Sequence, residues 1–309
     1  MRNLILCLGI LAGALAPAAE KVSVVTSLPD LAWAAQQIGK EFVDAKALLG
    51  GSENPHFVDA VPRFISTVAD AKLVCIVGLD LEVGWMPKVL TRSGNASVQP
   101  GGSGYCETGR AVSILEKPAG TVDRSMGDVH PQGNPHYWLS PHALAEGARE
   151  IRDGLVRVDP SHAAAYRKNY DSLASTLEAL QKKNKDRLAK KLAGLKTPAM
   201  EYHREFTYFF DAYGLKSFGS IEEKPGVPPS AGRIAEIAIA AKAAGVKVAL
   251  AGPYAPDKTL SRFTELSGVP VKSVPTSIQP KGKIADYVEL QDYLVGTVLE
   301  SLSGAGATP

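Results

Sequence analysis

The chain has 309 residues, a length that allows two domains, each with its own hydrophobic core. Hydrophobic residues make up 45% and charged residues 21% of the sequence, which are ordinary values for a globular protein. The formal net charge is +2, from 34 basic and 32 acidic residues, and no long run of one sign occurs. This balance argues against a nucleic-acid-binding protein, and we expect no nucleic acid among its partners.

The N-terminal segment has the composition of an export signal. Arg2 gives a positive start, an apolar stretch runs from Leu4 to Leu15, and the small residues Ala16-Pro17-Ala18-Ala19 follow. The apolar stretch is too short to span a membrane. We therefore expect residues 1–19 to be a signal peptide, cleaved between Ala16 and Glu20.

Strand and helix patterns alternate through the first part of the mature chain. Strands are predicted at 21–26, 42–49 and 73–77, and helices at 29–38 and 61–69. The run from Leu73 to Val77 is almost wholly apolar, which is typical of a parallel strand covered on both faces. The alternation indicates an α/β lobe with a mainly parallel sheet. Ligands usually bind such a lobe at the carboxyl ends of its strands.

Helical patterns dominate the middle of the chain. Ser140-Pro141 opens one helix, and Asp159-Pro160 opens a longer one, with Asp as N-cap and Pro in the first turn. The longer pattern continues to Gly194 and would span roughly 50 Å, enough to serve as a rigid spine between two lobes.

The second half repeats the α/β pattern. Strands are predicted at 198–203, 217–221, 246–250 and 271–274, and helices at 205–213, 231–244, 258–267 and from 286 onward. We expect an N-terminal lobe over 20–152, a linking helix over 153–194 and a C-terminal lobe over 195–309.

The tripeptide Asn-Pro-His occurs twice, at 54–56 and 134–136, each time before an aromatic residue. Proline fixes its own φ and favours an extended conformation for the preceding residue, so each histidine leaves a stiff loop in a defined direction. Neutral histidine is the commonest protein metal ligand. We interpret His56 and His136 as ligands of one metal ion; the alternative is a pair of surface turn histidines.

His203 is a third candidate, because it ends an apolar strand at the carboxyl edge of the second predicted sheet. Three imidazoles favour zinc over manganese, magnesium or calcium, which prefer oxygen ligands. We expect Asp286 to be the fourth ligand. The alternatives for this position are Glu53, Glu222, Glu223 and water, and the three glutamates could instead orient the imidazoles.

The mature chain keeps Cys75 and Cys106, whereas Cys7 lies inside the apolar stretch, which argues against a lipid-anchored cysteine at the cleavage point. Cys75 and Cys106 can pair in an oxidising compartment. Because Cys75 lies in an apolar strand, a plain buried thiol is the slightly favoured interpretation.

Several of these motifs together resemble one known family, the solute-binding proteins of zinc and manganese ABC transporters (TroA-like, cluster A-I). The stretches that carry the resemblance are Glu53–His56, Val77–Glu82, Asn134–Pro141, Tyr202–Phe209, Ala212–Leu215 and Pro229–Ile234. The resemblance implies two α/β lobes joined by one long helix, a metal in the cleft between them, and His56, His136 and His203 as ligands. Manganese members tend to place a carboxylate where His203 stands, so the resemblance favours a zinc-type member.

The same resemblance implies a periplasmic protein that is not an enzyme and that delivers Zn²⁺ as cargo to an inner-membrane ABC permease. We expect a monomer that works with the permease and with a periplasmic metal chaperone. Many zinc members carry a histidine-rich loop before the second ligand; here that loop holds only His130, with Asp123 and Asp128 nearby. We interpret the loop as solvated, with weak metal capture or handover as the alternative.

Other functions fit the same residues less well. A secreted zinc hydrolase also uses three histidines and a water, but the chain has no His-Glu-x-x-His or Gly-x-Ser-x-Gly motif. A manganese-binding transporter component is the other alternative, and an adhesin would need an interaction patch that the sequence does not offer. Since histidines bind metal only when neutral, acidification below about pH 6.5 should weaken binding.

Overall fold

The computed structural model describes residues 20–123, 126–127, 129–195 and 199–304. The predicted signal peptide, Asp128 and the first residue of the strand predicted at 198–203 lie outside this part of the chain. Within the described ranges, no helix combines the length and the apolar character that crossing a membrane requires.

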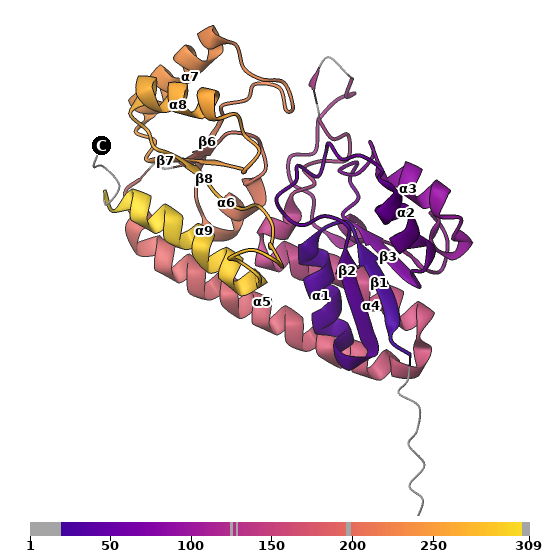
Figure 1. Ribbon diagram of the computed structural model, residues 1–309. Helices are drawn as coiled ribbons and strands as arrows, with labels where there is room; N and C mark the ends of the chain where they lie inside the picture. Colours follow the sequence, from indigo (N-terminus) through magenta and orange to yellow (C-terminus); the bar gives the residue numbers. More distant parts are fainter. Residues whose placement is uncertain (1–19, 124–125, 128, 196–198, 305–309) are drawn as a thin grey trace, which may run out of the picture.

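The N-terminal lobe is built on a four-stranded parallel sheet of order β2-β1-β3-β4. Figure 1 labels β2, β1 and β3 of this sheet. Its strands are β1 (Val22–Thr26), β2 (Val43–Ala47), β3 (Leu73–Ile76) and β4 (Tyr105–Glu107). All four residues of β3 are buried, as its apolar run predicts. The helices of the lobe are α1 (Pro29–Gly39), α2 (Pro62–Ala69), α3 (Met86–Ser93) and α4 (Pro141–Val158), and each has proline in its first turn. Proline suits this position because the first helical N–H groups have no intrahelical acceptor.

The C-terminal lobe repeats the design with a parallel sheet of order β6-β5-β7-β8. Its strands are β5 (Ala199–Glu201), β6 (Ser217–Ser220), β7 (Val248–Ala251) and β8 (Val271–Ser273). Its helices are α6 (Thr207–Tyr213), α7 (Ala231–Ala244), α8 (Asp257–Ser267) and α9 (Tyr287–Leu302). The order of strands and helices in the C-terminal lobe agrees with the sequence-based prediction, whereas α3 and β4 of the N-terminal lobe were not predicted.

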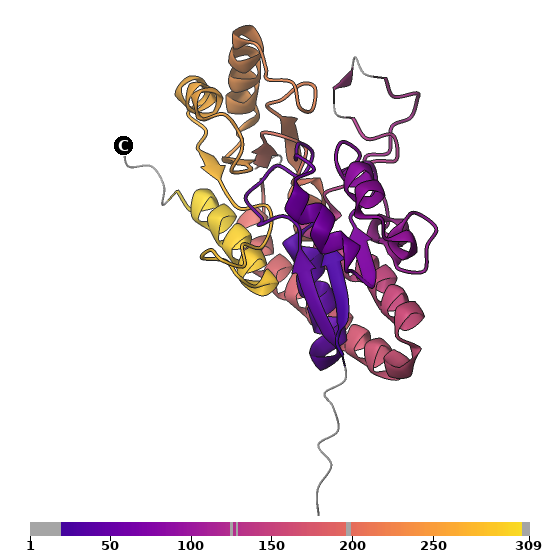
Figure 2. The ribbon, with the colours of Figure 1, turned by 45° about the vertical axis from the view of Figure 1, so that its right-hand side comes forward.

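One helix of 30 residues, α5 (Ala163–Leu192), connects the lobes. It packs against α1 and α4 of the N-terminal lobe and against α6 and α9 of the C-terminal lobe. Figures 1 and 2 show it running along the base of the molecule beneath both lobes, with α9 beside it. At 1.5 Å per residue it is about 45 Å long. The predicted two-lobed α/β fold with a long connecting helix is confirmed.

The lobes also meet directly through buried polar contacts. Asp30 on α1 accepts hydrogen bonds from the Ser277 hydroxyl and from the Ile278 amide at 3.4 Å. The Trp138 indole donates to the Thr276 carbonyl at 2.7 Å, and the Tyr287 hydroxyl donates to the Trp138 carbonyl at 2.6 Å. These bonds fix the loop 276–286 of the C-terminal lobe against the N-terminal lobe.

Cys75 and Cys106 form a disulfide across neighbouring strands of the first sheet. They are paired in register on β3 and β4, with their Cα atoms 4.4 Å apart. The buried free thiol favoured from the sequence is therefore wrong, because the register that places the two residues opposite each other is a tertiary property.

Candidate metal centre

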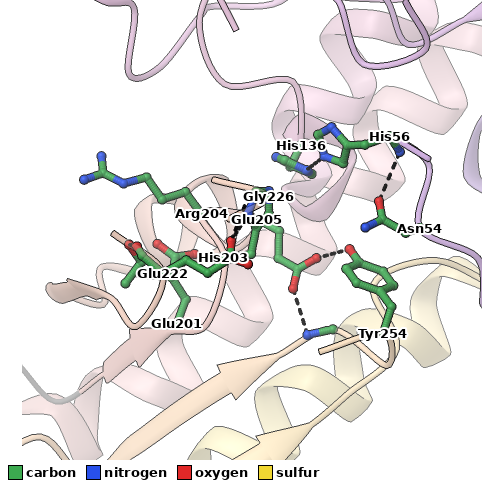
Figure 3. A network of polar contacts seen from close by, with 12 residues as sticks. Asn54, His56, His136, Glu201, His203, Arg204, Glu205, Glu222, Gly226 and Tyr254 are labelled. Atoms are coloured by element: carbon green, nitrogen blue, oxygen red, sulfur yellow. Dashed lines mark hydrogen bonds and ion pairs between the residues drawn. The ribbon is translucent and has the colours of Figure 1, made fainter. Parts of the chain in front are cut away.

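Three histidines converge between the two lobes. His56 lies in the loop that follows β2, His136 precedes α4, and His203 follows β5. One ring nitrogen from each lies within 4.8 Å of the others, so the three could hold a metal ion. The Nε2 atoms of His56 and His136 are 3.0 Å apart (Figure 3). The structure therefore brings together the three histidines that the sequence singled out.

The asparagine of each Asn-Pro-His motif turns back to hold the histidine two residues later. Asn54 Oδ1 accepts from the His56 amide at 3.1 Å, and Asn134 Oδ1 accepts from the His136 amide at 2.9 Å. Such Asx turns rigidify a loop without a strand or helix. Asn134 Oδ1 also lies 2.9 Å from His136 Nδ1, so that nitrogen carries the proton and Nε2 presents its lone pair to the centre.

His203 is held by a carboxylate in the same way. Its Nδ1 lies 2.9 Å from Glu222 Oε2, and both side chains are buried. Glu222 Oε2 also accepts from the Gly226 amide at 3.2 Å, which fixes the carboxylate (Figure 3). A carboxylate behind a histidine sets its tautomer and raises its basicity as a ligand. Glu222 therefore acts on the ring of His203.

Two further buried carboxylates shape the turn that carries His203. Glu201 Oε2 accepts from the Phe206 amide at 2.7 Å. Glu205 accepts from the Gly252 amide at 2.7 Å and from the Tyr254 hydroxyl. Burial raises the pKa values of both carboxyl groups above the usual range. These bonds fix the turn at the carboxyl edge of the second sheet.

Burial also sets the protonation of the histidines. Desolvation, followed by the charge of neighbouring imidazoles, lowers the pKa values of His56 and His136 well below 6.5. A lowered pKa keeps these rings neutral at and below neutral pH, and the neutral ring is the form that binds metal.

Asp286, the predicted fourth ligand, is not brought into this group. Its Oδ1 accepts from the Val288 amide at 2.7 Å and caps the N-terminus of α9. Its Oδ2 accepts from the Trp33 indole at 3.0 Å. Both oxygens thus serve the contact between α1 and α9. Of the alternatives, Glu53 accepts from the amides of Gly50 and Ser52.

His130, which the sequence analysis assigned to a solvated loop, lies beside the three histidines. Its ring centroid is 5.1 Å from that of His56 and 6.4 Å from that of His136. Its Nε2 is buried and has no hydrogen-bond partner. The sequence signal was its position just ahead of the second Asn-Pro-His motif. The interpretation as a solvated loop residue is wrong for the His130 side chain.

Two cavities flank the centre. The larger, of about 380 Å³, is lined by His130, His136 and His203 together with Glu223 and Lys224 from the loop of the C-terminal lobe. The smaller, of about 140 Å³, has His56, His203, Glu222 and Tyr254 in its wall. His203 therefore lines both cavities.

The donor set has a clear chemical preference. Zn–N distances of about 2.0–2.1 Å place the nitrogens of a tetrahedral site about 3.3 Å apart, close to the 3.0 Å between His56 and His136. Imidazole nitrogens suit zinc, copper and nickel, whereas manganese and magnesium favour oxygen ligands. A divalent ion of the first kind fits the residues present.

Comparison with known proteins agrees with this geometry. Residues 24–301 match the model of the ZnuA family, described as zinc-uptake complex component A, periplasmic. The chain belongs to this family. The family comprises substrate-binding components of transporters, which work with ABC permeases, and it is not a family of enzymes.

Curated relatives include both zinc and manganese proteins. The high-affinity zinc uptake system protein ZnuA of Bacillus subtilis is 24% identical over 290 residues, covering 92% of this chain and 88% of that protein. The zinc-binding lipoprotein AdcA of Streptococcus pneumoniae is 25% identical, but the matched part is 70% of this chain and only 42% of AdcA. The manganese ABC transporter substrate-binding lipoprotein PsaA of Streptococcus mitis is 23% identical, covering 93% of this chain and 91% of PsaA.

Among solved structures, a crystal structure of ZnuA superposes with a TM-score of 0.75 at 20% sequence identity. It covers 92% of this chain, and all of that structure is matched. The ZnuA-family fold is thus found over almost the whole chain.

Proposed function

We propose that this protein is the periplasmic zinc-binding component of an ABC importer. It captures Zn²⁺ with His56, His136 and His203 and delivers the ion to an inner-membrane permease for zinc. The observation that carries the proposal is the convergence of these imidazoles from both lobes, with their donor atoms within 4.8 Å of one another. Membership of the zinc-uptake family supports the same conclusion.

The choice of zinc rests on the donor atoms. All three proposed ligands are nitrogens, and the carboxylate of Glu222 is bonded to the ring of His203. Manganese prefers oxygen donors, so a set of three imidazoles is better suited to zinc. A manganese ABC transporter protein is similar in sequence over most of this chain, and for that reason the selectivity must be measured with both ions present.

Capture fits the site better than hydrolysis. A hydrolytic zinc centre needs a carboxylate or other base beside the metal-bound water. Glu222 accepts bonds from His203 and Gly226, and Glu205 accepts from Gly252 and Tyr254, so neither is available as that base. We infer that the metal is cargo and that the protein has no catalytic role.

Release follows from the division of the ligands between the lobes. His56 and His136 belong to the first lobe and His203 to the second, so separation of the lobes removes one ligand of three. We propose residues 20–152 and 195–309 as the two lobes and residues 153–194 as the helical segment that links them. The permease would lower the affinity by drawing the lobes apart.

Calorimetric titration of metal-free protein with Zn²⁺ tests the proposal. We expect one ion per chain and a large loss of affinity in His136→Ala. His142→Ala is the matched control, because His142 lies on α4 with its side chain 57% exposed. Absence of zinc uptake, or equal uptake by the wild type and His136→Ala, would contradict the proposal.

A further inference from the structure

The side chain of His130 has the features of a metal ligand that the assigned site does not use. Its Nε2 is buried and has no hydrogen-bond partner. Very few other side-chain nitrogens of the described residues are both buried and unpartnered. Burying a polar atom without a partner is unfavourable, so such an atom usually marks a missing ion, water or ligand. The atom belongs to a ring that lies against His56, with centroids 5.1 Å apart.

The backbone of Leu79 lies beside the His130 ring and acts to raise its pKa, whereas burial lowers it. Its Nε2 is the ring atom left buried without a partner. In His136 and His203 the acceptors Asn134 and Glu222 lie at Nδ1, so Nε2 is the nitrogen that those rings would present to a metal.

The turn that contains Leu79 is strained. Leu79 and Asp80 have φ values of 54° and 64°, in the left-handed region that non-glycine residues rarely occupy. Glu82 holds this turn by accepting from the amides of Val77 and Gly78 at 2.8 and 3.0 Å. A strained conformation persists where the surrounding structure enforces it, and here it places the backbone of Leu79 beside the His130 ring.

From these observations we propose that His130 is the fourth ligand of the bound metal. The proposal rests on the function proposed above and extends it, because it defines the complete coordination. Asp286 is occupied by the α9 cap and Trp33, so it does not compete for the position. His130 lies outside the group of donor atoms within 4.8 Å, and the 380 Å³ cavity that it lines gives its ring room to approach.

A site of four imidazoles has a defined selectivity. Four neutral nitrogens complete a tetrahedron, exclude water from the metal and leave no oxygen donor for manganese. A site of three histidines and a water still holds zinc, so loss of His130 should weaken binding and open one position without abolishing uptake. This distinction separates a fourth ligand from a residue that merely packs beside the site.

The test compares His130→Ala with His142→Ala, an exposed histidine of the same lobe. Zn²⁺ affinity is measured by competition with a chelator, and the coordination of bound Co²⁺ by its visible absorption spectrum. We expect His130→Ala to bind one zinc about 10- to 100-fold more weakly and to show a Co²⁺ spectrum with an added water ligand. The control should match the wild type in both measurements.

His130→Asp provides a second readout through metal selectivity. An oxygen donor in the fourth position should raise the affinity for Mn²⁺ relative to Zn²⁺ compared with the wild type. The inference is overturned if His130→Ala matches the wild type in zinc affinity and Co²⁺ spectrum while His203→Ala loses binding. If the wild type itself takes up no zinc, the proposed function fails together with this inference.

Discussion

The side-chain amide of Asn134 donates a hydrogen bond of 2.7 Å to the backbone carbonyl of Arg204. The same side chain holds His136 through Oδ1, and Arg204 directly follows His203. One residue of the second Asn-Pro-His motif therefore connects the ligand loops of the two lobes. The asparagine orients a ligand and also sets the distance between His136 and His203.

Replacement of Asn134 by alanine should weaken zinc binding although all histidines remain. The change removes the acceptor of His136 Nδ1 and the bond to Arg204, and loss of such supporting contacts typically lowers metal affinity about 10- to 100-fold. Asn54→Ala is the matched control, because the Asn54 side chain bonds the backbone amide of His56, whereas the Asn134 side chain also bonds the imidazole ring of its histidine. Equal affinities of the two variants, measured by chelator competition, would refute the role given to Asn134.

Glu222→Ala should lower zinc affinity by about the same factor. The variant leaves His203 Nδ1 without its acceptor, so the ring loses its fixed tautomer and part of its basicity. The neighbouring residue provides the control, since Glu223 is exposed. Glu223→Ala should titrate as the wild type does, and an identical loss in both variants would point to an effect of net charge alone.

Asp286→Ala should change folding stability more than zinc binding. Loss of the α9 cap costs about 1 kcal/mol of the free energy of unfolding, and loss of the Trp33 bond adds to it. Urea denaturation of the metal-free protein measures this cost. A severe loss of zinc affinity together with unchanged stability would restore Asp286 to the ligand set.

The buried histidines should make the metal-free protein less stable as the pH falls. A histidine whose pKa is lowered on folding contributes stability above the unfolded value of 6.5, and this stability is lost as the pH falls toward the folded pKa. Between these two pH values, the free energy of unfolding changes by up to about 1.4 kcal/mol per pH unit for each such histidine. Protons compete with zinc for these rings only when the pH approaches their lowered pKa values in the folded protein. Zinc binding should therefore persist to a lower pH than it would at histidines with a pKa of 6.5.

The measurement compares urea denaturation of wild type and His136→Gln at pH 7 and pH 5. Asp30 and Glu82 act in the opposite sense, because burial raises their pKa values to about 7. The informative quantity is therefore the difference between the two proteins, and the stability of the variant should fall less on acidification. An identical pH dependence in both proteins would show that His136 is not a neutral buried group.

The fold and most of the candidate site could be predicted from the sequence because both depend on patterns within short, continuous segments. The apolar run of β3, the proline-initiated helices α1, α2 and α4, and the long pattern of α5 were each predicted from a single continuous segment. The two Asn-Pro-His motifs carry their own geometry, since each asparagine bonds a residue only two positions away.

The features that the sequence did not reveal depend on contacts between distant segments. The Cys75–Cys106 pairing requires the register of β3 and β4. Asp286 was predicted as the fourth ligand, but its contact with Trp33, 253 positions away, gives it another role. His130 lies beside a strained turn at Leu79, and no pattern in the sequence reveals this contact.

The central claim is that His56, His136 and His203 from two lobes bind one zinc ion. Crystals of the zinc-loaded protein, with anomalous data collected on both sides of the zinc edge, test it most directly. We predict a single strong anomalous peak in the inter-lobe cleft, about 2.1 Å from the Nε2 atom of each of the three histidines. A peak bound elsewhere, or one that contacts only histidines of a single lobe, would contradict the account.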